Sequence, residues 1–495
     1  MSSVESSAGA ESPVDARPAA ARPNYIAWSA LALMTVSSVA SLRPAPTMAL
    51  YGLACVFLYV LPAIIFLIPT ALVSAELASG WKGGVFRWVT EGISPNMGFV
   101  AAWHQYAMTI FYYPTLLSFV ASTLAYVIYP EWAASGVWTA VVIISVYWLG
   151  TLLALRGGIG VIAKLASSGV LIGTLIPGAL LVILGIIYLA TGNPSAAPMT
   201  ADNLLPAWTG IASIVLIVSN FGAYSGMEMN AVHVNELKDP SKEFPKAMFV
   251  ATILVLLILI LPPLVISWFI PAEQLSLTAG VMQAFEAVFA HFGIQFLTPI
   301  VGLAIVSASL AGFMTWLSGP SRSLLLVSKE GGYLPPWFQK TNPNGVQINI
   351  LAAQGVITTI LALLFAFVPA VSDAYWMFMT ITTSVYLLMY LWLFRAAMNL
   401  RKRQPDHPRG YRAPALNLLC ILGFASSLAA ILISFVPPSQ FGEGSPVLFI
   451  VIVGGGILLL GVVIPFLLIK LRKPSWRISS STSEETASGS QEVSS

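Results

Sequence analysis

Apolar runs dominate this sequence, and each one is long enough to cross a lipid bilayer. A hydrocarbon core about 30 Å thick requires about 20 apolar residues in each helix that spans it. Twelve such runs lie near residues 25–52, 54–79, 97–128, 136–155, 161–190, 207–235, 246–270, 295–328, 349–369, 374–398, 413–436 and 446–471. The chain is therefore predicted to be an all-α membrane protein of about twelve transmembrane helices.

The basic residues lie almost entirely at one end of these runs. Of 23 Lys and Arg residues, all except Arg43 precede the first run, follow the last run or lie at every second junction. The other junctions contain acidic residues and no basic one: Glu131, Asp202, Glu273, Asp373 and Glu443. Because basic loops remain in the cytoplasm, both termini are predicted to be cytoplasmic.

The composition independently excludes a soluble protein. Charged residues make up 9% of the chain and hydrophobic residues 57%, whereas soluble domains contain about 25% charged residues. The net charge of +3 follows from the basic loops, so it gives no reason to expect nucleic-acid binding. The polar segments 1–24 and 473–495 are predicted to be disordered cytoplasmic tails, and 25–472 a single transmembrane domain.

Motifs for soluble chemistry are missing from the sequence. It contains no Gly-rich Lys-Ser/Thr loop of the kind that binds nucleotide phosphates, which argues against an ATP-driven pump. No pair of Cys or His residues has the spacing of a metal site. We therefore expect no enzyme activity, no cofactor and no metal. A channel would need a continuous polar stripe, which these runs do not show.

Two of the runs are interrupted in mid-membrane. In the first run, the segment Val39-Ala40-Ser41-Leu42-Arg43-Pro44-Ala45-Pro46 contains two prolines and a charge. In the sixth, Asn220-Phe221-Gly222-Ala223-Tyr224-Ser225-Gly226-Met227-Glu228 contains two glycines and a carboxylate. Breaks five helices apart are typical of two inverted five-helix repeats that hold a binding site between them. Unwound backbone at this depth is tolerated where it lines a cavity or is enclosed by protein.

Several motifs resemble those of the amino acid/polyamine/organocation superfamily. They are Glu76-Leu77-Ala78 with Gly83-Gly84-Val85-Phe86, Gly226-Met227-Glu228, and Gly319-Pro320-Ser321-Arg322 with Lys329-Glu330-Gly331. Within the superfamily, His233-Val234-Asn235-Glu236 and Ala279-Gly280-Val281-Met282-Gln283 are similar to the bacterial glutamate/γ-aminobutyrate antiporter branch. The resemblance extends over nearly all of residues 25–472.

That resemblance implies a LeuT-like fold, with ten core helices in two inverted repeats and two peripheral helices. It also implies that substrate binds at the two breaks, on Val39, Ala40, Ser41, Arg43, Tyr224, Ser225, Gly226, Met227 and Glu228. Further residues are predicted to line the cavity or a gate: Glu76, His104, Tyr106, Gly312, Met314, Trp316 and Tyr386. Gly312 stands where the acid-resistance antiporter of this branch has a carboxylate.

Some of these residues have alternative interpretations. Arg43 contacts an anionic substrate, has a structural role such as neutralising Glu228 or capping freed carbonyls, or snorkels toward the interface. Glu228 binds an ammonium group, carries a proton, or stabilises its helix as the partner of Arg43. Glu76 and Glu236 are expected to be structural or to brace a gate, with Lys82, Lys238 or Arg322 as their partners. His104 is either a packed, hydrogen-bonded histidine or a pH sensor. One or two aromatic residues of Phe111-Tyr112-Tyr113 could line the cavity, but the spacing does not identify them.

The sequence thus predicts a secondary active transporter of a bacterial cytoplasmic membrane. The expected reaction is exchange of an amino acid, glutamate-like by resemblance, for its decarboxylated amine or another amino acid. The alternative is a proton-coupled symporter of amino acids or polyamines. The expected partners are small amino acids or amines and membrane lipid, with no nucleic acid, and the protein is expected to be a monomer or a homodimer.

Overall fold

The structure is a computed structural model that describes residues 25–367, 371–440 and 445–477. The predicted tail 1–24 and residues 478–495 of the predicted tail 473–495 lie outside the described residues. Within the described part the secondary structure is helical, apart from an isolated bridge between Thr341 and Gln347. The predicted all-α membrane fold is therefore confirmed.

The α-helices follow the order of the apolar runs, and several crossings consist of more than one helix. Their bounds are α1 (Trp28–Val39), α2 (Ala45–Ala49), α3 (Cys55–Pro62), α4 (Ile68–Gly80), α5 (Gly84–Gly92), α6 (Pro95–Ile128), α7 (Gly136–Val170), α8 (Ile176–Ala190), α9 (Val218–Tyr224), α10 (Met227–Ala231), α11 (Pro240–Phe269), α12 (Gly280–Phe292), α13 (Thr298–Gly331), α14 (Ile348–Phe365), α15 (Val371–Arg403), α16 (Leu416–Ile433), α17 (Pro446–Leu458) and α18 (Ile464–Leu471). Short π segments join α3 to α4, α7 to α8 and α17 to α18.

Ten helical segments of the described residues are long and apolar enough to cross a membrane. The two predicted crossings that are not among them are the interrupted ones, which the structure divides into α1 and α2 and into α9 and α10. Helices predominate because each pairs its own backbone groups, which lipid cannot do. The breaks in the first and sixth crossings are thus confirmed.

A turn at Gly52 separates the first two crossings, which are continuous in hydropathy. Gly52 has φ +53, a left-handed value that glycine adopts readily because it lacks a Cβ atom. The helical segment Gly52–Gly80 begins at this residue. A single glycine therefore divides an apolar stretch that is too long for one helix.

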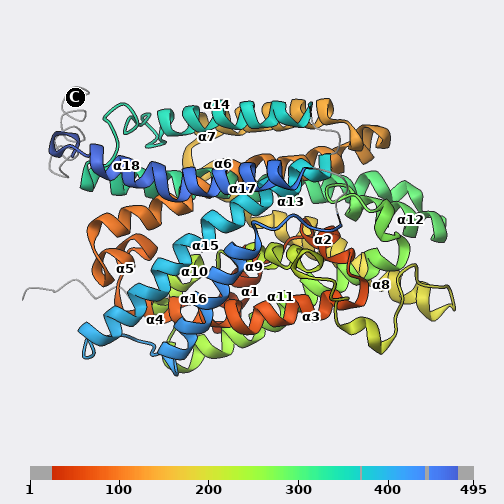
Figure 1. Cartoon of the computed structure of the whole chain (residues 1–495), viewed down its shortest axis with the longest axis horizontal. Coiled ribbons are helices and arrows are strands. Elements are labelled where there is room, and N and C mark those ends of the chain that lie inside the picture. Colours follow the sequence, from red (N-terminus) through yellow and green to blue (C-terminus); the bar gives the residue numbers. More distant parts are fainter. Residues whose placement is uncertain (1–24, 368–370, 441–444, 478–495) are drawn as a thin grey trace, which may run out of the picture.

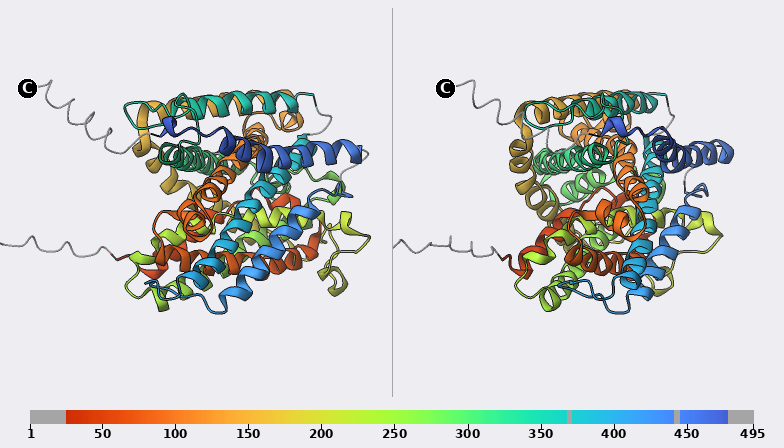
Figure 2. Two further views of the ribbon diagram at one scale, coloured as in Figure 1. Left: turned by 60° about the vertical axis from the view of Figure 1, so that its left-hand side comes forward. Right: turned by 90° about the vertical axis from the view of Figure 1, so that its left-hand side faces the viewer.

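The helices pack in layers, with α15 running diagonally between them (Figure 1). Helices α7 and α14 form one edge of the molecule, and α1, α3, α4 and α11 lie toward the opposite edge in every view (Figure 2). Helix α6 packs against α13, α15 and α7, whereas α1 and α2 pack mainly against α11. The molecule thus has two packing groups, one of α6, α7, α13 and α15 and the other of α1, α2 and α11.

The junctions rich in basic residues gather at one end of the molecule. Arg472 donates to Asn96 Oδ1 at 3.0 Å, Arg409 donates to Glu76 Oε1 at 2.7 Å, and the Ile26 amide donates to the Glu236 carbonyl at 2.9 Å. Helices α5 and α18 lie toward this end, and α12 lies at the other (Figure 1). The charge pattern of the sequence therefore corresponds to a physical separation in the fold.

Two boundaries differ from the expected ones. The backbone remains helical from Gly136 to Val170, across the gap expected between residues 155 and 161, because a glycine inside a helix costs only about 1 kcal/mol and does not by itself end it. The ordered domain also extends past residue 472. Pro474–Trp476 forms a 3-10 turn, and the Trp476 carbonyl accepts a hydrogen bond from Gln339 Nε2 at 2.9 Å.

Candidate functional site

The first break separates α1 from α2. Helix α1 ends at Val39, Ala40 is extended with ψ 118°, and α2 begins at Ala45. Proline at residues 44 and 46 prevents continuous helical hydrogen bonding here. The amides of Ser41 and Leu42 consequently lie outside the helical ladder, and Ser41 Oγ accepts a hydrogen bond from the Arg43 amide at 3.2 Å.

The second break separates α9 from α10 at Ser225 and Gly226. Gly226 has φ +107, which residues with a Cβ atom rarely adopt. Its amide donates to Tyr390 Oη at 2.9 Å and to Glu228 Oε2 at 3.2 Å. The unwound backbone is thus stabilised by side chains of α10 and α15.

Helix α9 is fixed to the first two crossings by two polar side chains. The buried Asn220 amide donates to the Leu58 carbonyl at 2.8 Å and contacts Met48 Sδ at 3.1 Å. Tyr224 Oη donates to the Tyr59 carbonyl at 2.8 Å. Tyr224 therefore points toward α3, where it fixes the position of α9.

A cavity of about 580 Å³ lies between the two breaks. Its walls come from α1, the α1–α2 linker, α6, the π segment η4 (Leu171–Leu175), α9, α10, α13 and α15. The lining residues are Leu33, Met34, Val39, Ala40, Ser41, Arg43, Pro44, Met108, Tyr112, Leu116, Thr174, Gly222, Ala223, Ser225, Gly226, Met229, Ala308, Ser309, Ala311, Gly312, Thr315, Trp316, Met379, Thr382, Thr383 and Tyr386. This volume accommodates a small organic molecule.

Arg43 is the charged residue in this lining. Its guanidinium carbon lies 5.1 Å from the centre of the Tyr112 ring. None of the ion pairs among the described residues involves Arg43. The cavity therefore presents a cation that forms no ion pair with the residues that the structure describes, in the segment where the first crossing is unwound.

Glu228 lies behind the cavity wall, and its carboxylate faces the tyrosines of α15. Its side chain is 1% exposed. Tyr386 Oη donates to Glu228 Oε1 at 2.5 Å, Tyr390 Oη donates to Glu228 Oε2, and Gln105 Nε2 donates at 3.4 Å. Arg43 and Glu228 thus have separate partners in this conformation, and the alternative in which they neutralise each other is not observed.

The structure brings nine of the sixteen predicted site residues to the cavity. They are Val39, Ala40, Ser41, Arg43, Ser225, Gly226, Gly312, Trp316 and Tyr386. The lining does not include Tyr224, Met227, Glu228, Glu76, His104, Tyr106 or Met314. Residues next to a lining residue on the same helix point away from the cavity. The sequence alone did not show which face of each helix lines the cavity.

The residues outside the lining have other contacts. His104 is 1% exposed and its Nε2 lies 2.8 Å from the Gly461 carbonyl, in the π segment η11 (Leu459–Val463). This geometry is that of the packed, hydrogen-bonded interpretation. Tyr106 packs on Trp103, and their ring centroids lie 5.7 Å apart. The Met314 sulfur faces Gly150, where an added Cβ atom would lie 3.2 Å from it.

Glu76 lies at the basic end of the molecule, with partners other than those expected. It pairs with Arg401 and Arg409 and accepts the Ala413 amide at 2.8 Å. Lys82, Lys238 and Arg322 form no ion pair with it among the described residues, so that expectation was wrong. The loop after α15 folds back onto α4, which sequence spacing cannot reveal.

Several lining residues were not singled out by the sequence. Thr382 and Thr383 belong to α15 and Thr174 to η4, within apolar runs that look alike on every face. Tyr112 is one of three adjacent aromatic residues that the sequence does not distinguish, and the structure shows that it lines the cavity. The sequence offers only a weak indication of these positions, because hydroxyl side chains recur every few residues within apolar runs.

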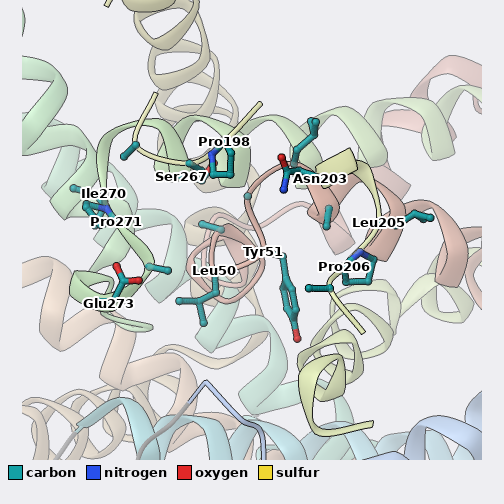
Figure 3. A pocket seen from close by; sticks show the side chains of 18 residues that line it. Leu50, Tyr51, Pro198, Asn203, Leu205, Pro206, Ser267, Ile270, Pro271 and Glu273 are labelled. Carbon is teal, nitrogen blue, oxygen red and sulfur yellow. The ribbon is translucent and has the colours of Figure 1, made fainter. Parts of the chain in front are cut away.

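A second cavity, of about 330 Å³, lies away from both breaks (Figure 3). It is formed by the Gly52 turn, segment 196–207 and the end of α11. Tyr51, Asn203 and Glu273 contribute polar side chains, and Glu273 is the charged residue in its lining. It shares no lining residue with the cavity between the breaks.

Comparison with known sequences identifies the family. The sequence pattern of the amino acid permease family matches residues 26–458. The chain belongs to the amino acid permease family. It is therefore a transporter of the amino acid/polyamine/organocation superfamily and an integral membrane protein of a bacterial inner membrane, and the expectation that it is not an enzyme is supported by its transporter relatives.

Individual members of the family narrow the comparison. An uncharacterised transporter of Legionella pneumophila is 33% identical over 89% of this chain and 95% of its own length. A glutamate/γ-aminobutyrate antiporter of Lactococcus lactis is 29% identical over 83% of each chain. The predicted resemblance to this branch of amino acid permeases is thereby confirmed.

A solved structure supports the same fold. The crystal structure of MhsT in complex with L-phenylalanine superposes with a TM-score of 0.50, covering 84% of this chain and 99% of that one at 17% identity. At this identity the likeness concerns the fold alone. It agrees with the LeuT-like arrangement of this amino acid permease, in which the first and sixth crossings are unwound.

Proposed function

We propose that this amino acid permease exchanges an amino acid with a side-chain carboxylate for its decarboxylated amine or another amino acid. The observation that carries the proposal is Arg43, the charged residue in the cavity lining, which has no ion-pair partner among the described residues. A charge in a membrane interior is expensive unless it is paired. An anionic substrate group would supply the missing partner.

The two breaks supply complementary groups for the rest of an amino acid. Backbone amides freed at the first break favour the α-carboxylate, and the carbonyl end of α9 favours the ammonium group. Arg43 would then hold the side-chain carboxylate, which an acidic amino acid keeps when it loses its α-carboxylate by decarboxylation. Both members of the exchange pair would therefore use Arg43, as the antiporter name of the Lactococcus lactis relatives suggests.

The orientation follows from the charge pattern and belongs to the proposal. With the basic junctions in the cytoplasm, both termini are cytoplasmic. The cavity extends along Leu33 and Met34 of α1 and Met229 of α10, toward this basic end. All five residues of α2, beyond Arg43, are buried. The conformation is accordingly inward-facing, one of the two states of alternating access.

Exchange predicts that uptake depends on substrate inside the vesicle. We expect proteoliposomes preloaded with glutamate to take up labelled glutamate or γ-aminobutyrate several-fold faster than empty vesicles, without ATP. Initial rates with a panel of preloaded amino acids and amines measure this dependence. If empty vesicles with an imposed proton gradient accumulate substrate as fast as preloaded ones, proton-coupled symport replaces exchange.

A further inference from the structure

The contact between Arg43 and Tyr112 joins the two packing groups of the molecule. Arg43 belongs to the linker between α1 and α2, which pack mainly against α11. Tyr112 belongs to α6, which packs against α13, α15 and α7. The guanidinium carbon lies 5.1 Å from the ring centre, within the range of a cation–π interaction. Movement of one group relative to the other at this position would break the contact.

The contact lies in the cavity, next to the buried helix that follows Arg43. Arg43 and Tyr112 both line the cavity, and α2 beyond them is completely buried. Tyr112 also packs against Trp316 of α13 at a centroid separation of 5.5 Å, which helps to hold the ring in place. The face of the ring is thus a fixed partner for a side chain on the opposite packing group.

The same guanidinium is a candidate ligand for the substrate carboxylate. The planar guanidinium of an arginine presents several N–H donors in a geometry that matches a carboxylate. A carboxylate forms charge-assisted hydrogen bonds with a guanidinium. These bonds are stronger than the attraction between a guanidinium and the face of an aromatic ring. Substrate would therefore compete with Tyr112 for Arg43.

We propose that the Arg43–Tyr112 contact restrains the empty transporter and that a substrate carboxylate releases it. This inference rests on the proposed exchange function. When the cavity is empty, opening of its closed end requires the guanidinium to lose its aromatic partner. With substrate bound, the carboxylate pairs with Arg43, and opening no longer leaves that charge unpaired. The empty form would then reorient slowly, which makes flux in one direction depend on flux in the other.

The test compares efflux with and without external substrate. Proteoliposomes containing the full chain are preloaded with labelled glutamate and diluted into buffer that contains either no amino acid or excess glutamate. We expect Tyr112→Leu to raise the ratio of efflux into empty buffer to efflux into glutamate buffer by roughly fivefold or more. Loss of a cation–π contact is large enough to produce a change of this size. Tyr112→Phe keeps the ring and should keep the low wild-type ratio.

Controls separate the ring contact from general disruption. Phe111→Leu removes an adjacent ring, which packs on Phe378 at 5.2 Å and not on Arg43, and should keep the wild-type ratio. Tyr112→Met, with a flexible side chain of similar length, should leak as Tyr112→Leu does, and it decides the test if the leucine variant does not fold. The proposal fails if these variants retain the wild-type ratio, or if Tyr112→Phe leaks equally. If wild-type efflux is not stimulated by external substrate at all, the proposed exchange function fails instead.

Discussion

Arg43→Ala is expected to weaken the binding of acidic amino acids by about tenfold or more, because a hydrogen bond to a charged group contributes about 1.5–3 kcal/mol. Substrates without a second anionic group should lose far less affinity, since their carboxylate and ammonium groups contact the helix breaks. The concentration dependence of uptake of glutamate, γ-aminobutyrate and a neutral amino acid measures this difference. γ-Aminobutyrate should follow glutamate, because it retains the carboxylate assigned to Arg43.

A structural role for Arg43 predicts a different result. If Arg43 only balanced Glu228, all substrates would suffer alike and Arg43→Ala/Glu228→Gln would recover activity, since neither charge would remain unpaired. In the structure Glu228 is bonded to Tyr386 and Tyr390 and Arg43 faces Tyr112. We therefore expect no rescue in the double variant. Uniform loss with rescue would contradict the binding role.

Glu76→Gln is expected to lower the free energy of unfolding by about 3–5 kcal/mol, the usual result of removing one partner of a buried ion pair. The Glu76 carboxylate is 2% exposed and the Arg409 side chain 1% exposed. Arg409 would remain buried without a counter-charge, and Arg401 would lose its partner at the surface of the same cluster. Unfolding of the purified protein in mixed detergent–SDS micelles measures the change.

Glu236→Gln is the matched control for Glu76. Its carboxylate is 48% exposed and pairs with His233 at 3.0 Å. Exposed ion pairs contribute little, about 0.2–1 kcal/mol, because water screens them. Similar unfolding curves for the two variants would show that the Glu76 cluster does not hold α4 to the loop after α15.

The helical crossings and their interruptions could be predicted from the sequence. Proline residues at 44 and 46 and glycine residues at 222 and 226 stand inside apolar runs, where any loss of helical hydrogen bonding has to be compensated by the fold. The turn at Gly52, between the first two crossings, is likewise a local feature of the backbone. These are local backbone effects, and they depend only on neighbouring residues.

Side-chain partners between distant segments could not be predicted. Glu76 pairs with arginines more than 300 residues away in the sequence. The expected partners lie closer to it in the sequence. The faces of α6, α13 and α15 that line the cavity were equally obscure, because lipid-facing and core-facing positions in a membrane are both apolar. Met314 and Gly312, two residues apart, illustrate this: Gly312 lines the cavity and Met314 packs in the core.

Alkylation of a cysteine at position 312 tests most directly whether the cavity between the breaks holds the substrate. A Cβ atom at Gly312 would meet nothing within 4 Å, so Gly312→Cys fits without displacement. Gly319→Cys is the control, because that position is equally open but does not line the cavity. The native Cys55 and Cys420 are both buried and should react slowly.

The measurement is the alkylation rate of each variant with and without glutamate. At a glutamate concentration ten times its Kd, we expect alkylation at position 312 to slow by roughly tenfold, since few sites remain empty. Alkylation at position 319 should be unaffected by glutamate. An unchanged rate at position 312, under conditions where glutamate is transported, would contradict the assignment of this cavity as the substrate site.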